Sequence, residues 1–163
     1  MLTRRSDLLL ATLCLGVVVA GCSGERGDDP NPMGEPRARG LVLEATRAFL
    51  FAPITEAQAG GYFVLHNRGE ASDTILEVSA DWADHGMIHE TREEGGRVRM
   101  SHLPVLPVPA QDSVVLRPGG FHVMLVRLAR MPVAGDTVEW SLRMSSGATV
   151  RVLAPVVAYG QEP

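Results

Sequence analysis

Cysteine and positive charge are both scarce in this sequence. The 2 cysteines are Cys14 and Cys22, so the chain from residue 23 onward contains no thiol. Disulfides, thiol catalysis and Cys-x-x-Cys redox motifs are therefore excluded from that part of the chain. The formal net charge is −4, and none of the 15 basic residues is a lysine. Phosphate binding needs clustered positive charge, so no nucleic-acid partner is expected.

Long hydrophobic runs are also missing, with one short exception near the N-terminus. The run Leu8 to Ala20 follows Arg4 and Arg5 and is shorter than the roughly 20 residues that a membrane helix needs. A positive start, an apolar run and small residues are typical of a signal peptide, here residues 1–21. The end Val19-Ala20-Gly21-Cys22 resembles a bacterial lipobox, which implies lipidation of Cys22. An ordinary secretory signal with an incidental cysteine is the alternative.

The next segment, Ser23 to Gly40, is rich in Gly, Pro, Asp and Glu and has no apolar periodicity. Such a segment spans on the order of 20–25 Å as a flexible tether. Residues 22–40 are thus predicted to be a lipidated N-terminus and tether, and residues 41–163 one domain. The protein would be exported and anchored to a membrane by lipid, facing the periplasm or another extracytoplasmic space.

The domain is expected to be all-β. Short β-rich runs alternate with turn sequences such as Asn67-Arg68-Gly69 and Arg117–Gly120. About nine strands at this spacing predict an antiparallel sandwich or barrel. The stretch Leu103–Pro109 is expected at an edge, because proline donates no ladder hydrogen bond. The predicted strands are Leu41–Phe49, Gly61–His66, Thr74–Val78, Met87–Thr91, Arg97–Leu103, Ser113–Leu116, Phe121–Leu128, Thr137–Met144 and Thr149–Val157.

Two His/Met pairs stand out within the predicted strands. On a strand, His122 and Met124 point to the same side, about 7 Å apart, while the apolar residues between them point to the other side. His89 and Met100 flank the hairpin sequence Glu94-Gly95-Gly96. With either two-residue loop, these two residues share a face.

The two possible hairpin loops give different partners. A Glu94-Gly95 loop places His89 opposite Met100, and a Gly95-Gly96 loop places His89 opposite His102. The first arrangement is mildly favoured because it sets Glu90 across from Arg99. A three-residue loop would put His89 and Met100 on different faces.

Two imidazoles and two thioethers without a thiolate indicate copper. Thioether sulfur selects Cu(I), imidazole also accepts Cu(II), and a blue-copper electron carrier would need a cysteine ligand. We therefore predict one copper site made by His89, Met100, His122 and Met124, with Cu(I) favoured. His85 and Met87 have the same strand parity as His89, so they are candidate auxiliary ligands that extend the soft face; an exposed strand end is the slightly favoured alternative for them. His102 has the same parity as Met100 and is a candidate supporting partner or extra Cu(II) ligand.

The spacing His-x10-Met-x21-His-x-Met also matches the periplasmic copper chaperone family PCu(A)C, which residues 41–157 resemble. The resemblance implies a cupredoxin-like, immunoglobulin-like β-sandwich that carries one copper ion. It further implies delivery to the CuA centre of cytochrome c oxidase, alongside a Sco-type thiol protein. The flanking sequences that carry the resemblance are His89-Glu90-Thr91, Leu116–Gly120, His122–Leu125 and Gly135–Val138.

The sequence therefore predicts a copper chaperone that works by ligand exchange and is not an enzyme. No Ser-His-Asp order, paired-carboxylate site or phosphate-binding loop is evident. Two alternatives remain open: a copper-buffering or resistance lipoprotein without an oxidase partner, and a structural β-sandwich that binds no metal.

Overall fold

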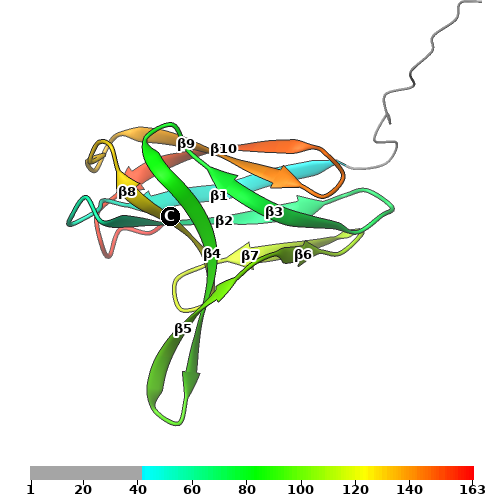
Figure 1. The fold of residues 1–163 in the computed structure, drawn as a ribbon, viewed down its shortest axis with the longest axis horizontal. Helices are drawn as coiled ribbons and strands as arrows, with labels where there is room; N and C mark the ends of the chain where they lie inside the picture. The colour runs from blue at the N-terminus through cyan, green and yellow to red at the C-terminus, as the bar shows by residue number, and fades with distance from the viewer. Residues whose placement is uncertain (1–41) are drawn as a thin grey trace, which may run out of the picture. The chain divides into compact units, whose positions relative to one another are not determined.

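The computed structural model describes residues 42–163, which form ten strands (Figure 1). The predicted signal peptide, the tether and Cys22 lie outside the described residues. Within residues 42–163, no helix has the length and apolar character needed to cross a membrane. The strands are β1 Leu43–Phe51, β2 Gln58–Asn67, β3 Asp73–Ser79, β4 Ala83–Glu94, β5 Arg97–Leu103, β6 Leu106–Val108, β7 Asp112–Leu116, β8 Phe121–Leu128, β9 Thr137–Met144 and β10 Thr149–Val157.

All ten strands belong to one hydrogen-bonded sheet, in the order β5-β4-β8-β7-β2-β1-β10-β9-β3-β6. Additional pairings of β4 with β3 and of β8 with β2 close this sheet on itself around the core. The prediction of an all-β sandwich or barrel is confirmed. Two pairings, β1 with β10 and β7 with β8, are parallel, so the architecture is not purely antiparallel.

One strand, β6, was not among the nine predicted and lies in the proline-rich stretch Leu103–Pro109. It pairs only with β3 and is the last strand in the sheet order. This is the edge position that was expected for a proline-rich strand. Asn67 is buried beside it and donates side-chain hydrogen bonds to the carbonyl oxygens of Ala71 and Val108. These bonds tie the edge strand to the end of β2.

The core follows the strict alternation of β9 and β10. In both strands every second side chain is buried, and Trp140, Leu142 and Val152 are at most 1% exposed. Each such side chain contributes about 1.5–3 kcal/mol to folding through its removal from water. Gly61 on β2 leaves room for the Trp140 ring, since a Cβ there would lie 3.1 Å from the ring.

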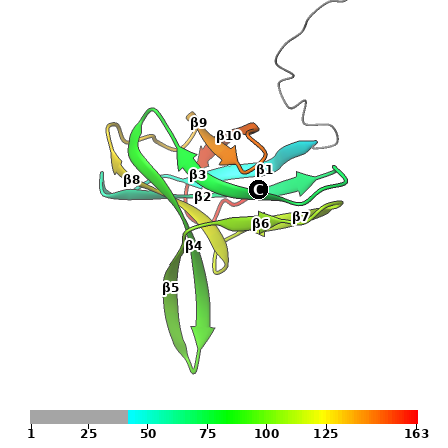
Figure 2. The ribbon, with the colours of Figure 1, turned by 45° about the vertical axis from the view of Figure 1, so that its right-hand side comes forward.

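The hairpin of β4 and β5 projects away from the rest of the domain (Figures 1 and 2). Its loop is Gly95-Gly96, because Glu94 pairs with Arg97. The preference for a Glu94-Gly95 loop was therefore wrong. A type I′ turn needs positive φ at both central residues, and here Gly95 (60°) and Gly96 (74°) provide it without steric cost.

Asp73 at the start of β3 is a buried carboxylate that fixes the β9–β10 turn. The Ser145 and Ser146 hydroxyls donate hydrogen bonds of 2.6 Å to it, and the Thr74 amide donates one of 2.7 Å. Burial opposes ionisation of Asp73, but these hydrogen bonds outweigh it and hold its pKa below the usual value of 3.8.

Replacement of Asp73 by alanine should lower the free energy of unfolding at pH 7 by about 3 kcal/mol, because several charge-assisted hydrogen bonds are lost. The pKa is depressed in the folded state. The stabilisation is therefore complete above the unfolded-state pKa and is lost as the pH falls through the folded-state pKa. Urea unfolding of the full chain should thus show the gap between wild type and variant shrinking from about pH 5 to about pH 2. Asp112→Ala, at an exposed carboxylate, is the control, and a pH-independent gap would contradict the assignment.

Candidate metal centre

Three histidines form one row across three neighbouring strands. His89 on β4 pairs with His102 on β5 and with His122 on β8. Directly paired residues of antiparallel strands point to the same face, so all three rings lie on one side of the sheet. The His89 ring stands nearly perpendicular to both neighbours, with centroid distances of 5.7 Å to His122 and 5.8 Å to His102.

Methionines lie on the two rows beside the histidines. Met124 on β8 pairs with Met87 on β4, and Met100 on β5 pairs with Thr91 on β4. All are on the histidine face, because they lie two residues from a histidine on the same strand. The predicted two-faced character of β8 is observed, since Val123 and Leu125 point the other way and are completely buried.

Three of the four predicted ligands line one cavity of about 520 Å³. Met100, His122 and Met124 line it, and Met100 is 54% exposed whereas His122 and Met124 are 4% and 6% exposed. His89 does not line this cavity, but its ring adjoins that of His122. The structure thus brings the four predicted residues into one neighbourhood, with Met100 on the solvent side.

The neighbouring imidazoles of His89 and His122 can each offer a nitrogen lone pair to a metal ion. Nδ1 of His122 lies 3.0 Å from the carbonyl oxygen of Gly120, which can only accept, so Nδ1 donates and Nε2 keeps its lone pair. Nδ1 of His89 is buried and has no hydrogen-bond partner. Burial, followed by the nearby His122 and His102, lowers the pKa of His89 below its usual value of 6.5. A neutral imidazole is the ligand form.

An aromatic wall lines the same cavity, and sequence reasoning did not predict it. The rings of Phe51 and Tyr159 are stacked, with their centroids 4.4 Å apart. The ring centroid of Tyr62 lies 5.4 Å from that of Phe51 and 6.2 Å from that of His122. Gly60 lies beneath this wall, where a Cβ would come within 2.9 Å of the Tyr62 hydroxyl and would displace it. Burial, with a smaller contribution from Tyr159, raises the pKa of Tyr62, so its hydroxyl stays protonated at neutral pH. No local sequence pattern connects Phe51 with Tyr159.

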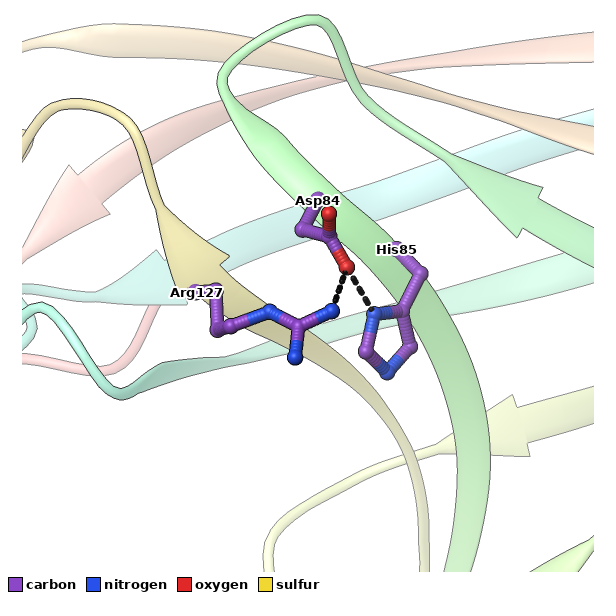
Figure 3. A network of polar contacts seen from close by, with 3 residues as sticks. All are labelled: Asp84, His85 and Arg127. Carbon is purple, nitrogen blue, oxygen red and sulfur yellow. Dashed lines mark hydrogen bonds and ion pairs between the residues drawn. The ribbon is translucent and has the colours of Figure 1, made fainter.

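Of the auxiliary candidates, His85 lines neither this cavity nor the smaller hollow described below. Its Nδ1 lies 2.7 Å from Asp84, which also pairs with Arg127 on β8 (Figure 3). Met87 and His102 line a different hollow of about 230 Å³ at the edge of β4. The two ring nitrogens of the remaining histidine, His66, form hydrogen bonds with the hydroxyls of Thr46 and Ser113, at 2.9 and 2.7 Å.

The available donors favour a soft metal. Among residues 42–163, no three His, Cys, Asp or Glu side chains lie close enough to hold one metal ion together. The donors that accompany the paired imidazoles are methionine sulfurs, which suit copper and fit zinc or iron poorly. The buried, unpartnered Nδ1 of half-buried His89 and the free Nε2 of His122 fit such an ion.

The fold and this site define a small β-sandwich domain with clustered His and Met side chains. The family described as "Putative lipoprotein LpqE-like" matches residues 42–156. The chain belongs to this family. It is also 25% identical over 156 residues to "Putative lipoprotein Lxx21020" of Leifsonia xyli subsp. xyli, which covers 95% of this chain and 93% of that protein.

Solved PCuAC domains share the fold, which confirms the family resemblance found in the sequence. The copper-bound PCuAC domain from PmoF2 superposes with a TM-score of 0.60 at 23% identity, covering 71% of this chain and 92% of that domain. The solution structure of CuI-DR1885 from Deinococcus radiodurans has a TM-score of 0.57 at 27% identity, covering 79% of this chain and 85% of the other.

Proposed function

We propose that this protein is an extracytoplasmic copper chaperone. It holds one copper ion, preferably Cu(I), with His89, Met100, His122 and Met124 and releases it by ligand exchange. Lipid on Cys22 would anchor it to the membrane. The observation that carries the proposal is the single face on which β5, β4 and β8 gather imidazole and thioether donors.

The relatives support copper as the cargo. The PmoF2 domain is copper-bound in its solved structure, and DR1885 carries CuI in its own. The spacing of the four residues in the sequence and their arrangement around one cavity favour the same ligand set here. A site without thiolate is also suited to an oxidising compartment, where thiols are lost to disulfides.

The geometry suits binding followed by release. His122 and Met124 are buried and would hold the ion from inside, whereas Met100 is exposed on the hairpin and would close the site from the solvent side. Thioethers are neutral donors, so an acceptor with thiolates or imidazoles can replace them one at a time. Met100 would be the first donor to be replaced, because an acceptor can reach it directly.

The proposed acceptor is the CuA centre of cytochrome c oxidase, with a Sco-type thiol protein acting beside it. This part of the proposal depends on the family resemblance. Buffering of copper without transfer would use the same site, and the two roles differ only in what happens when an acceptor is offered.

The test is a Cu(I) titration of the full chain with Cys14 and Cys22 replaced by serine, so that thioether and imidazole are the soft donors. About one equivalent should bind in competition with a chromophoric Cu(I) chelator, and Zn(II) should not displace it. Transfer of the ion to the apo CuA domain of cytochrome c oxidase would support delivery. Retention of the ion would favour buffering, and no binding at all would leave a structural sandwich.

A further inference from the structure

A second imidazole–thioether pair lies next to the proposed copper site. His102 on β5 and Met87 on β4 line the hollow of about 230 Å³, which shares no lining residue with the larger cavity. This hollow forms where β3 and β5 both pair with the same edge of β4, β3 at Gly86 and β5 from Ile88 onward. His102 is exposed and Met87 is half-buried.

His89 connects the two groups of donors. It pairs directly with His122 on one side and with His102 on the other, and its ring is almost equally far from both, at 5.7 and 5.8 Å. It lines neither hollow itself, but its two direct partners do, His122 in the larger one and His102 in the smaller one. Its buried Nδ1 has no protein partner.

The three histidines do not act as one three-imidazole site. Among the described residues, no three such side chains are close enough to hold a single ion. Each neighbouring pair, however, includes His89 and has a methionine two residues away on one of its strands. An ion can therefore be held on the His122 side or on the His102 side, with His89 common to both.

We propose that His102 and Met87, together with His89, form a second station that the copper ion occupies on its way out of the protein. The inference rests on the proposed function. In the transfer, the bond from copper to exposed Met100 breaks first. The bonds to His122 and Met124 then break as bonds to His102 and Met87 form, while His89 stays bound and the ion keeps its oxidation state. The ion moves from a pair of buried donors to a half-buried and an exposed donor, where an acceptor meets it.

The test measures the rate of Cu(I) release. The full chain with Cys14 and Cys22 replaced by serine is loaded with one equivalent of Cu(I) and mixed with bathocuproine disulfonate, whose absorbance reports capture. The double variant Met87→Leu/His102→Asn should release copper about tenfold more slowly, because the exit route through these two donors is gone; this change in rate corresponds to about 1.4 kcal/mol in the barrier to release. Its equilibrium affinity for Cu(I) should be unchanged. Met→Leu preserves side-chain volume, so the fold is kept.

The matched control is His85→Asn/Met131→Leu, which changes one exposed histidine and one exposed methionine outside both hollows. It should release copper at the wild-type rate. A wild-type rate in the Met87/His102 variant would overturn the second station. A loss of equilibrium affinity for Cu(I) in that variant would also overturn the second station, because it would show that Met87 and His102 hold the ion in the loaded protein. If the wild-type chain binds no Cu(I), the proposed function itself fails, which the titration detects before any rate is measured.

Discussion

Replacement of both Met100 and Met124 by leucine should strongly weaken Cu(I) binding by this protein. Leucine keeps the apolar volume of each side chain but removes the sulfur, so the proposed site keeps its two imidazoles and loses both of its soft donors. In competition with a chromophoric Cu(I) chelator, the full chain lacking Cys14 and Cys22 should go from holding about one equivalent of Cu(I) to holding near none. Since Met124 is buried and Met100 exposed, the single variants separate the inner from the outer donor.

The control for this loss is Met144→Leu. Met144 is also a strand methionine, 1% exposed, but it lies in the core on β9 and lines neither cavity. This variant should keep its copper. Undiminished Cu(I) binding by the Met100/Met124 variant would contradict the proposed ligand set, and equal loss in the Met144 variant would point to a general effect on folding.

Replacement of Gly86 by alanine should lower the free energy of unfolding by about 3 kcal/mol. A Cβ on Gly86 would lie 2.7 Å from two side-chain carbons of Val78 and 2.8 Å from its carbonyl oxygen. The backbone atom cannot move aside without breaking the pairing of β3 with β4, which joins them only at these two residues. Urea unfolding of the full chain measures the effect.

Gly120→Ala is the matched control for Gly86→Ala. A Cβ at Gly120 would lie 3.4 Å from the flexible Arg117 side chain and 3.7 Å from the Arg117 carbonyl oxygen, which are ordinary contact distances, and the φ of Gly120 lies outside the left-handed region. The change in stability should stay within about 0.5 kcal/mol. Equal stabilities for the two variants would show that β3 does not press against β4 at Gly86.

The sequence predicted those features that depend on local alternation. The two-faced strand β8 and the shared face of His89 and Met100 follow from the period of two along a strand and from a two-residue hairpin loop. The choice between the two loops was not decided by the Glu90–Arg99 pairing, because backbone strain at the turn outweighs one exposed ion pair. In the structure Arg99 is opposite Arg92 instead.

The sequence predicted that the two His/Met pairs meet, but it did not predict which distant strands pair to bring them together. Nothing near His89 in the sequence indicates that β4 pairs with β8 and sets His89 against His122. The aromatic wall likewise combines Phe51, Tyr62 and Tyr159 from three separate segments. The hollow next to His102 exists because β3 and β5 share one edge of β4, which no local pattern encodes.

The most direct test of the central claim is X-ray absorption at the copper edge of the Cu(I)-loaded full chain without Cys14 and Cys22. Because no cysteine remains, every sulfur bound to copper must belong to a methionine. The proposed site predicts two sulfur and two nitrogen donors, and both sulfur donors should disappear in the Met100/Met124 variant. A spectrum with only nitrogen and oxygen donors in the wild-type protein would contradict a site made by His89, Met100, His122 and Met124.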